Sequence, residues 1–517
     1  MSAADGISRR AVIAGGVAGA ALAAGPALAQ RLGRSVRAGR YTGLVDRGVP
    51  AFLGIRFATA ARWAPPVAVP SSTERLTATA FGPIAPQQGQ TDEPQSEDCL
   101  YLNVWTPEIA PAARRPVMVY FHGGAYTTGT VTDPLTQGPH LAADGDVVVV
   151  TVNQRLNVLG YGWLSPWSER FRDSGNLGQL DLICALKWVR DNIAAFGGDP
   201  ARVMVFGQSG GGAKIATLMA MPAAAGLFHA AATMSGQQVT ATGPANATAR
   251  MRAFMAKVGV AEGGTDALLA MPVERLMEGL QAEDPIRGGR VYFGPVLDMV
   301  HLPRHPFWPD APAQSHDIPM ILGNTHDETR AFINPRGPVL QGLTWDNLAE
   351  RLASNIIIDL DPCWVAAQYR AQYPDWTVEQ AFYAATTAGR SWPGQVLEAD
   401  ARAAAGAEKT WVYQLDRPSP VDPLRGAAHT DDIPYVFGTL EAKGSFSGND
   451  ARAREISRRM MGAFTGLART GQVDWQPYTL PDRQTLVVGQ ESIAAVSDPR
   501  RWERELWAKA PYIQPGT

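Results

Sequence analysis

The sequence contains little cysteine and no long apolar run. Only three cysteines occur among 517 residues, which is too few and too scattered for a disulfide framework or a thiolate metal site. No run of about 20 strongly apolar residues is present, as a membrane-spanning helix would require. The 46 Lys and Arg residues nearly balance the 49 Asp and Glu residues, so nothing points to a nucleic-acid partner. These absences indicate a soluble globular protein with a large core.

The first 29 residues have the features of an export signal. Ser8-Arg9-Arg10 opens a twin-arginine pattern, an Ala- and Gly-rich segment follows, and Ala27-Leu28-Ala29 fits a small-residue cleavage site. Several glycines and Pro26 interrupt the segment, which argues against a membrane anchor. We therefore expect residues 1–29 to be a signal peptide and residues 30–517 to form one exported, periplasmic or secreted domain without a membrane anchor.

Short apolar runs rich in β-forming residues alternate with helical patterns along the chain. The predicted strands cover residues 117–121, 147–152, 203–206, 319–322 and 410–415. Apolar residues at helical spacing predict a helix over residues 180–196, which two glycines end. Residues 223–283 are rich in Ala and Met, show helical spacing and contain no strand pattern, so they are expected to belong to a helical cap. The alternation predicts an α/β sheet.

A Gly-x-Ser-x-Gly pattern lies at one strand-to-helix junction. Residues 203–206 read as a buried strand, Gly207 to Gly211 follow, and an apolar helical stretch comes next. A serine on such a sharp turn has a strained backbone and an exposed hydroxyl, and only small neighbours let the turn close. Ser209 is therefore the candidate nucleophile, although a chain with so many glycines can contain the pattern by chance.

A serine hydroxyl needs a histidine base and a carboxylate that orients it. His429 lies in a loop after the 410–415 strand, and α/β folds with a Gly-x-Ser-x-Gly turn present their catalytic base in such a loop. An ordinary surface histidine would give the same pattern. The acid should follow another strand, and Asp327 and Glu328 both follow the 319–322 strand. Position alone leaves the choice between these two carboxylates open.

The chemistry also needs backbone N–H donors for the oxyanion that forms when the serine attacks a carbonyl carbon. A glycine-rich turn after the 117–121 strand offers the amides of Gly124 and Ala125. The amide of Gly210, directly after the candidate nucleophile, would complete the oxyanion hole.

Several longer motifs resemble the type-B carboxylesterases, the cholinesterase-like family. Residues 96–104 read SEDCLYLNV, which matches a family signature, and residues 51–58 resemble an early family element. Residues 175–181, 196–200 and 433–438 match further elements in the same order. The resemblance covers most of the chain beyond the signal segment.

This resemblance implies an α/β-hydrolase fold, with a central, mostly parallel sheet flanked by helices and with helical cap insertions. It assigns the triad acid to Glu328, with Ser209 as nucleophile and His429 as base, and it calls for no cofactor and no metal. It also implies two structural ion pairs, Arg62 with Glu97 and Arg155 with Asp181.

Some positions depart from the family pattern. The family usually has Glu and Ala around the nucleophile, where this chain has Gln208 and Gly210. Family members often pair the cysteine equivalent to Cys99 with an earlier cysteine, but Ala85 stands near that place, so Cys99 is expected to be unpaired. A looser and less charged pocket beside Ser209 follows from these differences.

The substrate pocket is expected to include Tyr126, Gln208 and Phe293, the last as a wall of the acyl pocket. No tryptophan occurs in residues 87–95, so the aromatic cation site for choline is expected to be absent. Arg287 or Arg290 could meet an anionic acyl group, but ordinary solvated arginines are the favoured interpretation.

The sequence thus predicts a serine carboxylesterase that acts on small-molecule esters through an acyl-enzyme. The alternatives are carbamate or amide hydrolysis by the same triad and, less favoured because all three triad residues are present, a non-catalytic binding protein. The oligomeric state stays open.

Overall fold

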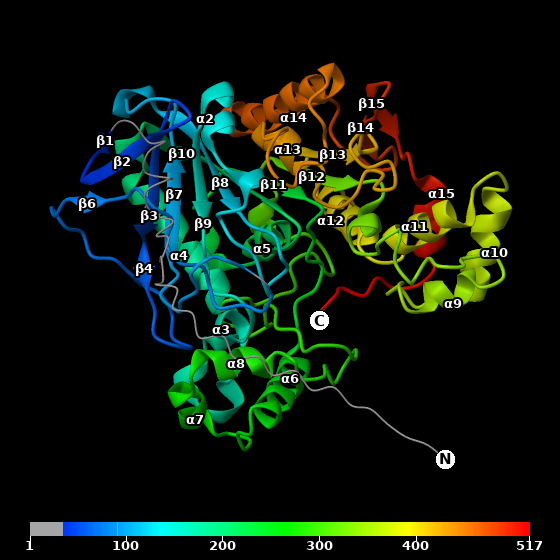
Figure 1. Ribbon diagram of the computed structural model, residues 1–517, viewed down its shortest axis with the longest axis horizontal. Helices are drawn as coiled ribbons and strands as arrows, with labels where there is room; N and C mark the ends of the chain where they lie inside the picture. The colour runs from blue at the N-terminus through cyan, green and yellow to red at the C-terminus, as the bar shows by residue number, and fades with distance from the viewer. Residues whose placement is uncertain (1–34, 90) are drawn as a thin grey trace, which may run out of the picture.

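The computed structural model describes residues 35–89 and 91–517. The predicted signal peptide, residues 1–29, lies outside the described residues. Within them, the chain forms one large sheet with helices on both faces and two helical excursions beyond its edge (Figure 1).

The large sheet has thirteen strands in the described part of the chain. Twelve follow the order β1-β2-β3-β7-β9-β8-β10-β11-β12-β13-β14-β15, and β6 pairs with β2. In this order, the seven strands from β9 to β14 pair in parallel and the pairs on either side of them are antiparallel, whereas β6 pairs with β2 in parallel. The strands of this sheet are β1 (Val36–Ala38), β2 (Tyr41–Asp46), β3 (Val49–Arg56), β6 (Leu76–Thr77), β7 (Tyr101–Trp105), β8 (Arg115–Phe121), β9 (Val148–Val152), β10 (Gly198–Gln208), β11 (Ala230–Met234), β12 (Met320–Thr325), β13 (Thr410–Leu415), β14 (Gln484–Val488) and β15 (Ile493–Ser497). A separate ribbon pairs β4 (Ala58–Thr59) with β5 (Val67–Ala68).

All five predicted strands exist, as β8, β9, β10, β12 and β13, and all five belong to the parallel part of the sheet. The prediction that residues 223–283 contain no strand is wrong, because β11 lies within them. Its sequence, AAATM, is short and made mostly of alanine, so it has neither the β-branched residues nor the alternation that mark a strand. Small side chains suit this position because α5 crosses directly over β11.

Helices cover both faces of the sheet. The α-helices of the described residues, including those that lie beyond the sheet, are α2 (Pro139–Gly145), α3 (Asn157–Tyr161), α4 (Leu177–Asn192), α5 (Gly210–Leu218), α6 (Pro244–Lys257), α7 (Thr265–Ala270), α8 (Val273–Gly279), α9 (Leu348–Ala353), α10 (Pro362–Gln372), α11 (Val378–Ala388), α12 (Trp392–Ala404), α13 (Ile433–Phe437), α14 (Ala451–Thr470) and α15 (Arg501–Trp507). The helix predicted over residues 180–196 is α4 with the 3₁₀ turn that continues it to Phe196.

Alternate residues of the central strands enter two separate cores. Val117 and Val119 of β8 pack with α4 and α5 on one face. Met118 and Tyr120 of the same strand pack with α2, α13 and α14 on the other, the group of helices along the top of Figure 1. Because successive side chains of a strand point to opposite faces, a continuous apolar run is what a strand covered on both sides requires.

Two helical excursions extend beyond the sheet (Figure 1). Helices α6, α7 and α8 pack with α3 around a core that contains Met251, Phe254 and Leu276. Helices α9 to α12 share another core with α15. The predicted helical insertions are therefore confirmed, and the second group carries part of the site described below.

Both predicted ion pairs are confirmed. Arg155 donates to Asp181 from Nε at 2.9 Å and from Nη2 at 2.6 Å, and both side chains are buried. Arg62 pairs with Glu97 through two hydrogen bonds at a half-buried position. None of the three cysteines, all within the described residues, forms a disulfide, as expected for Cys99.

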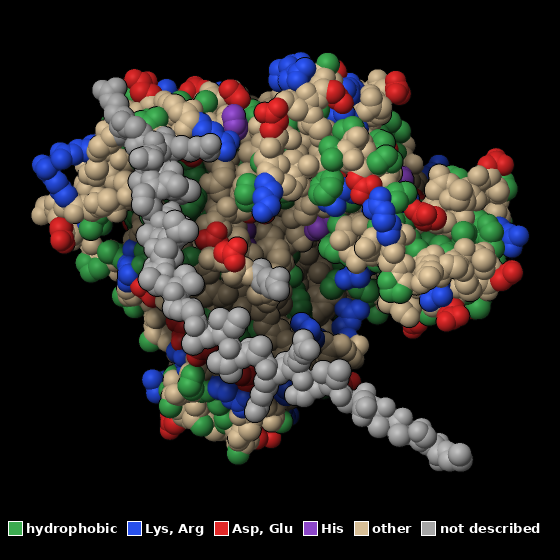
Figure 2. All heavy atoms as spheres, in the orientation of Figure 1, with side chains coloured by type: hydrophobic (Ala, Val, Ile, Leu, Met, Phe, Trp, Pro, Cys, Tyr) green, Lys and Arg blue, Asp and Glu red, His purple; other side chains and the backbone are tan. Residues whose placement is uncertain are grey.

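The surface in Figure 2 carries acidic and basic side chains intermixed over the visible face, without a large patch of one sign. This agrees with the near balance of charge in the sequence. Among the described helices, none combines the length and the apolar character that a membrane crossing needs.

Candidate active site

Ser209 occupies a sharp turn between β10 and α5. Its backbone has φ 54° and ψ −124°, a strained conformation for a residue with a side chain, and its amide donates to the carbonyl oxygen of Met234 at 2.7 Å. A Cβ on Gly207 would lie 2.6 Å from the carbonyl carbon of Gly211. The turn therefore closes only with glycine at these positions, and it leaves Ser209 half-buried at the carboxyl edge of the sheet.

Glu328 and His429 meet at the same edge. Glu328 opens a 3₁₀ turn just after β12, and His429 lies in the loop after β13. Glu328 Oε2 accepts a hydrogen bond from His429 Nδ1, and Glu328 Oε1 accepts one from the amide of Thr325 at 2.8 Å. The parallel strands place these segments beside Ser209, although they are far apart in sequence.

The carboxyl group of Glu328 is almost fully buried, at 2% exposure. Burial alone would raise its pKa, but the charge and hydrogen bond of His429 together with the amide of Thr325 outweigh burial and hold the pKa below its ordinary value. Glu328 is thus an anion that can hold the imidazole and stabilise its protonated form.

Asp327, the other carboxylate that sequence position allowed, faces a different way. Its Oδ2 accepts from the amide of Ala427 at 3.1 Å, and its Oδ1 lies 3.2 Å from His326 Nδ1. The structure brings Glu328, and not Asp327, into contact with His429.

Gln208 lies against the free edge of the imidazole. Its Nε2 is 3.0 Å from His429 Nε2, a distance at which the amide donates to a neutral imidazole that carries its proton on Nδ1. No hydrogen bond joins Ser209 Oγ to His429 among the described residues. Such bonds are often long or absent in a free enzyme and form when substrate binds.

The three amides predicted for the oxyanion hole converge. Gly124 and Ala125 lie in the turn after β8, both with positive φ, and Gly210 begins α5. A Cβ on Gly210 would overlap the backbone of Ala125, so glycine permits the close approach of the two segments. Within the described residues, none of the three N–H groups donates a backbone hydrogen bond, which leaves them free for a ligand oxygen.

Lys214, one turn after Ser209, is fully buried beneath this loop. Its Nζ donates to the carbonyl oxygens of His122 at 3.1 Å and Ala125 at 2.8 Å, at the two ends of the oxyanion turn. Burial lowers the pKa of Lys214 to about 7. Sequence reasoning missed this residue, although a lysine within the apolar start of a helix was a usable signal.

A cavity of about 420 Å³ opens over Ser209, His429 and the oxyanion amides. Tyr126 and Gln208 line it, as expected. The placement of Phe293 in the pocket is corrected: this residue is buried against Phe254 in the core of the α6–α8 excursion, and its neighbour Tyr292 lines the cavity instead. Neighbouring side chains of this non-helical segment face opposite ways, which the sequence does not reveal.

Further lining residues come from segments that the sequence did not connect with the site. They are Gln237 and Gln238 after β11, Phe332 after β12, Arg390 and Ser391 before α12, and Gln514 near the end of the chain. Arg287 and Arg290 are exposed and do not line the cavity, in agreement with the favoured interpretation.

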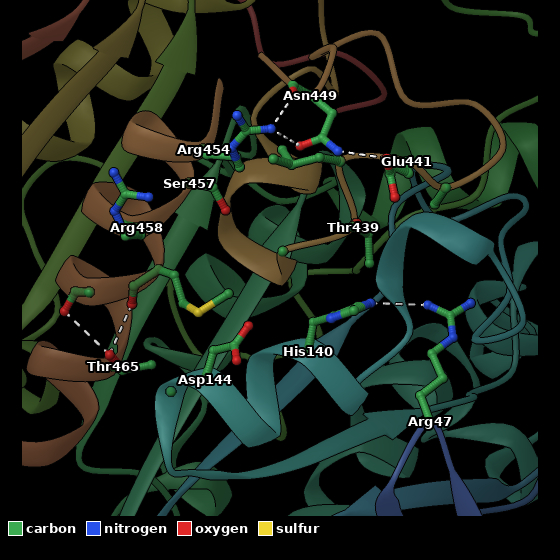
Figure 3. Close-up of a pocket in the computed structure, with 16 residues that line it drawn as sticks. Arg47, His140, Asp144, Thr439, Glu441, Asn449, Arg454, Ser457, Arg458 and Thr465 are labelled. Atoms are coloured by element: carbon green, nitrogen blue, oxygen red, sulfur yellow. Dashed lines mark hydrogen bonds between the residues drawn. The ribbon is translucent and has the colours of Figure 1, made fainter. Parts of the chain in front are cut away.

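A second cavity, of about 780 Å³, lies between α2, α14 and the loop after α13 (Figure 3). Arg47 and His140 share a contact of 3.2 Å on one wall, and Asn449 donates to Glu441 at 2.6 Å on another. None of the candidate catalytic residues lines it. The cavity therefore lacks the nucleophile and base that meet at the sheet edge.

Comparison with known proteins identifies the family. Residues 32–500 match the carboxylesterase family. The chain is 35% identical to the para-nitrobenzyl esterase of Bacillus subtilis, over 90% of this chain and 96% of that protein, and 30% identical to the phenmedipham hydrolase of Pseudarthrobacter oxydans, over 89% and 96%.

Solved structures agree with this match. A carboxylesterase of Geobacillus stearothermophilus superimposes with a TM-score of 0.79 at 32% identity, over 92% of this chain and 99% of that one. A structure of a para-nitrobenzyl esterase gives a TM-score of 0.76 at the same identity. The predicted α/β-hydrolase fold is confirmed, and the chain belongs to the carboxylesterase family of carboxylic ester hydrolases.

Proposed function

We propose that the protein hydrolyses small-molecule carboxylic esters through an acyl-enzyme on Ser209, with His429 as general base and Glu328 as the acid that orients it. The observation that carries the proposal is the buried contact between Glu328 and His429, beside a strained Ser209 and three unpaired amides in one cavity. This arrangement, at the edge where parallel strands end, supports a serine-hydrolase mechanism.

In the first half of the reaction, Ser209 Oγ attacks the carbonyl carbon and its proton passes to His429 Nε2. The amides of Gly124, Ala125 and Gly210 then donate to the oxyanion of the tetrahedral intermediate. Collapse of this intermediate breaks the ester bond, and His429 gives its proton to the departing alcohol. The hydrogen bond from Gln208 to His429 Nε2 has to yield during this step, since the same nitrogen accepts the serine proton.

In the second half, water attacks the acyl-enzyme and passes a proton to His429. Collapse releases the carboxylic acid and returns the proton to Ser209 Oγ. Glu328 remains an anion throughout and stabilises the imidazolium each time it forms.

A labelling and turnover experiment tests the proposal. A fluorophosphonate should label Ser209 in the folded protein, and a series of p-nitrophenyl esters from acetate to long acyl chains should be hydrolysed, whereas Ser209→Ala should show neither property. Folded protein that resists the label and leaves every ester intact would restore the binding-protein alternative. Matched ester, carbamate and anilide substrates in the same assay distinguish the three possible substrate classes.

We also propose that the protein is exported, on the twin-arginine pattern and the cleavage site in residues 1–29. Expression of the full chain with and without Arg9→Lys and Arg10→Lys tests this. The intact signal should deliver esterase activity outside the cytoplasm and give a mature protein that begins at Gln30, whereas equal retention of both forms in the cytoplasm would contradict export.

A further inference from the structure

Arg390 brings a positive charge to the active-site cavity. It lies in the tight turn between α11 and α12 and lines the same cavity as Ser209 and His429. The turn is anchored on both sides of Arg390: the amide of Gly389 donates to Ala385 O at 2.7 Å, Gly389 O accepts from Ile357, and Ser391 N donates to Thr387 O. The residue is therefore held at the cavity wall by its backbone, not on a mobile loop tip.

The charge of Arg390 has no counterion. Within residues 35–89 and 91–517, its guanidinium forms no ion pair and donates no hydrogen bond, and its Cζ lies 5.5 Å from the centroid of the Phe332 ring. The lining of the cavity contains no Asp or Glu.

A second cation reinforces the imbalance. Burial and the charge of Arg287 lower the pKa of Arg390, and the nearby Tyr512 phenol only partly opposes them. An arginine kept beside another arginine, without an acid, gains most from an incoming anion.

Ser391 supplies a second unsatisfied group at the same place. The residue lines the cavity, and its Oγ is buried and has no hydrogen-bond partner among the described residues. Ser391 also precedes the thirteen-residue helix α12, whose N-terminal end favours negative charge. A guanidinium, an unpaired hydroxyl and a helix N-terminus thus occur in two consecutive residues of the cavity lining and the helix that follows them.

The wall is close to the reacting atoms. Phe332 bridges the two groups, because its ring centroid is 4.9 Å from that of His429 and 5.5 Å from Arg390 Cζ. The guanidinium carbon therefore lies no more than about 10 Å from the imidazole centre. A carboxylate a few bonds from the ester carbonyl would reach Arg390 while the carbonyl carbon sits at Ser209.

We propose that Arg390 and Ser391 form an anion subsite of the active site, and that the preferred substrates are esters that carry a carboxylate. The inference rests on the proposed ester hydrolysis and names its substrate class. Arg390 is a specificity-determining residue in this proposal and takes no part in the proton transfers.

Two pairs of matched substrates test the proposal and locate the carboxylate. Monomethyl glutarate and its neutral isostere methyl glutaramate place the charge on the acyl side. Para-carboxyphenyl butyrate and para-carbamoylphenyl butyrate place it on the alcohol side. For at least one pair, the wild-type kcat/KM should favour the charged ester by roughly 10- to 100-fold, the range of a desolvated charge-assisted hydrogen bond.

Substitutions then assign the preference to the subsite. Arg390→Gln should reduce the preference to about 1, measured as the ratio of kcat/KM between the charged and neutral partners, so that a change common to both esters cancels. Fluorophosphonate labelling of Ser209 in the variant shows that it is folded. Arg390→Lys should keep part of the preference, because charge remains while the two-pronged geometry is lost. Ser391→Ala should lower it by a smaller factor. Arg290→Gln, at an exposed arginine outside the cavity, is the matched control and should change nothing.

The outcomes separate this inference from the proposed function. Neutral esters turned over by Ser209 with no preference for either charged partner would overturn the subsite and leave the esterase intact. A preference that survives in Arg390→Gln, or that Arg290→Gln abolishes equally, would also overturn it. Failure of all four esters together with failure of fluorophosphonate labelling would instead overturn the proposed function.

Discussion

Arg155 and Lys214 are both buried, but within the described part of the chain only Arg155 has a partner of opposite charge. Arg155 has a carboxylate partner, Asp181, that accepts from Nε, from Nη2 and from the Arg155 amide. Lys214 donates only to two backbone carbonyls and has no carboxylate partner among the described residues. The partner keeps the pKa of Arg155 above its ordinary value, whereas burial lowers the pKa of Lys214 to about 7.

This difference distinguishes two regions: the frame, which is the scaffold that contains the Arg155–Asp181 pair, and the cleft, which is the active-site cavity with the oxyanion loop and Lys214 beneath it. In the frame, Arg155 is matched by Asp181, so removal of either charge should cost stability and leave the chemistry intact. At the cleft, Lys214 and Arg390 leave positive charge uncompensated beside the oxyanion loop and the substrate cavity. Their removal should change turnover more than folding, because these cations meet a negative charge only when the substrate is bound or the transition state forms.

The largest expected effect comes from the cleft. Ser209→Ala should lower kcat by about 10⁵- to 10⁶-fold, since the residues of a triad act as a unit. The midpoint of thermal unfolding should change little, because the hydroxyl donates no hydrogen bond in the frame. Ester turnover and a thermal melt on the same sample measure both quantities. A large loss of stability would show that Ser209 contributes to folding as the frame residues do, and would contradict the distinction between frame and cleft.

Glu328→Gln should be the next largest, with a loss of about 10⁴-fold in kcat. The amide cannot stabilise the imidazolium and can favour the wrong tautomer of His429. Glu328 also has a depressed pKa, so its charge contributes to stability above the ordinary carboxyl pKa and this contribution is lost as pH falls through the lower folded value. Unfolding in urea near neutral pH and in the acidic range should show a smaller acid sensitivity for the variant, and an equal sensitivity would contradict the ionised state.

Asp181→Asn probes the frame. Removal of one charge leaves Arg155 buried without its counterion, which should cost about 3 to 5 kcal/mol in the free energy of unfolding. The kcat of the remaining folded protein should stay within a few-fold of wild type, because neither residue lines the active-site cavity. Urea unfolding and active-site titration with a fluorophosphonate separate the two quantities. A stable but inactive variant would show that the pair belongs to the cleft after all.

Lys214→Met is expected to lower kcat by about 10-fold at constant KM, the smallest loss among the variants of the cleft, because the oxyanion turn loses the donor that holds both its ends. Two buried carbonyl oxygens also lose their partner, at a cost of about 1 to 3 kcal/mol. Lys214→Gln, which keeps a donor without a charge, should recover part of the rate. Equal rates in all three proteins would show that the lysine only fills space.

The pH dependence of stability provides a second measurement on Lys214. Its pKa is about 7 in the folded protein and has its ordinary higher value in the unfolded chain, so between these values the unfolded state binds the extra proton. The free energy of unfolding should therefore rise with pH above 7, by at most about 1.4 kcal/mol per pH unit from this group. Urea unfolding of wild type and Lys214→Met at two pH values should show the contribution in the wild type alone.

The sequence predicted some features of the fold and of the candidate triad correctly and left others undecided or wrong. The strand-to-helix turn at Ser209 was readable because small residues are obligatory there, and the buried strands were readable because both faces are covered. The choice of Glu328 over Asp327 needed either the family motif or the contact with His429, since the two are neighbours in sequence. β11 was missed because alanine carries no β signal, and Phe293 was misplaced because the direction of a side chain in an irregular segment depends on what packs around it.

What the sequence determined by itself is local: which segments form buried strands, where a turn must be made of glycine, and which residue types could perform acyl transfer. Tertiary structure decided what depends on several segments at once. It placed Arg390 and Ser391, which follow the nucleophile by more than 180 positions in the printed sequence, at the wall of the same cavity. It also buried Lys214 under the oxyanion loop while it gave Arg155 a partner. Burial and charge compensation are properties of the assembled surroundings, and no single segment specifies them.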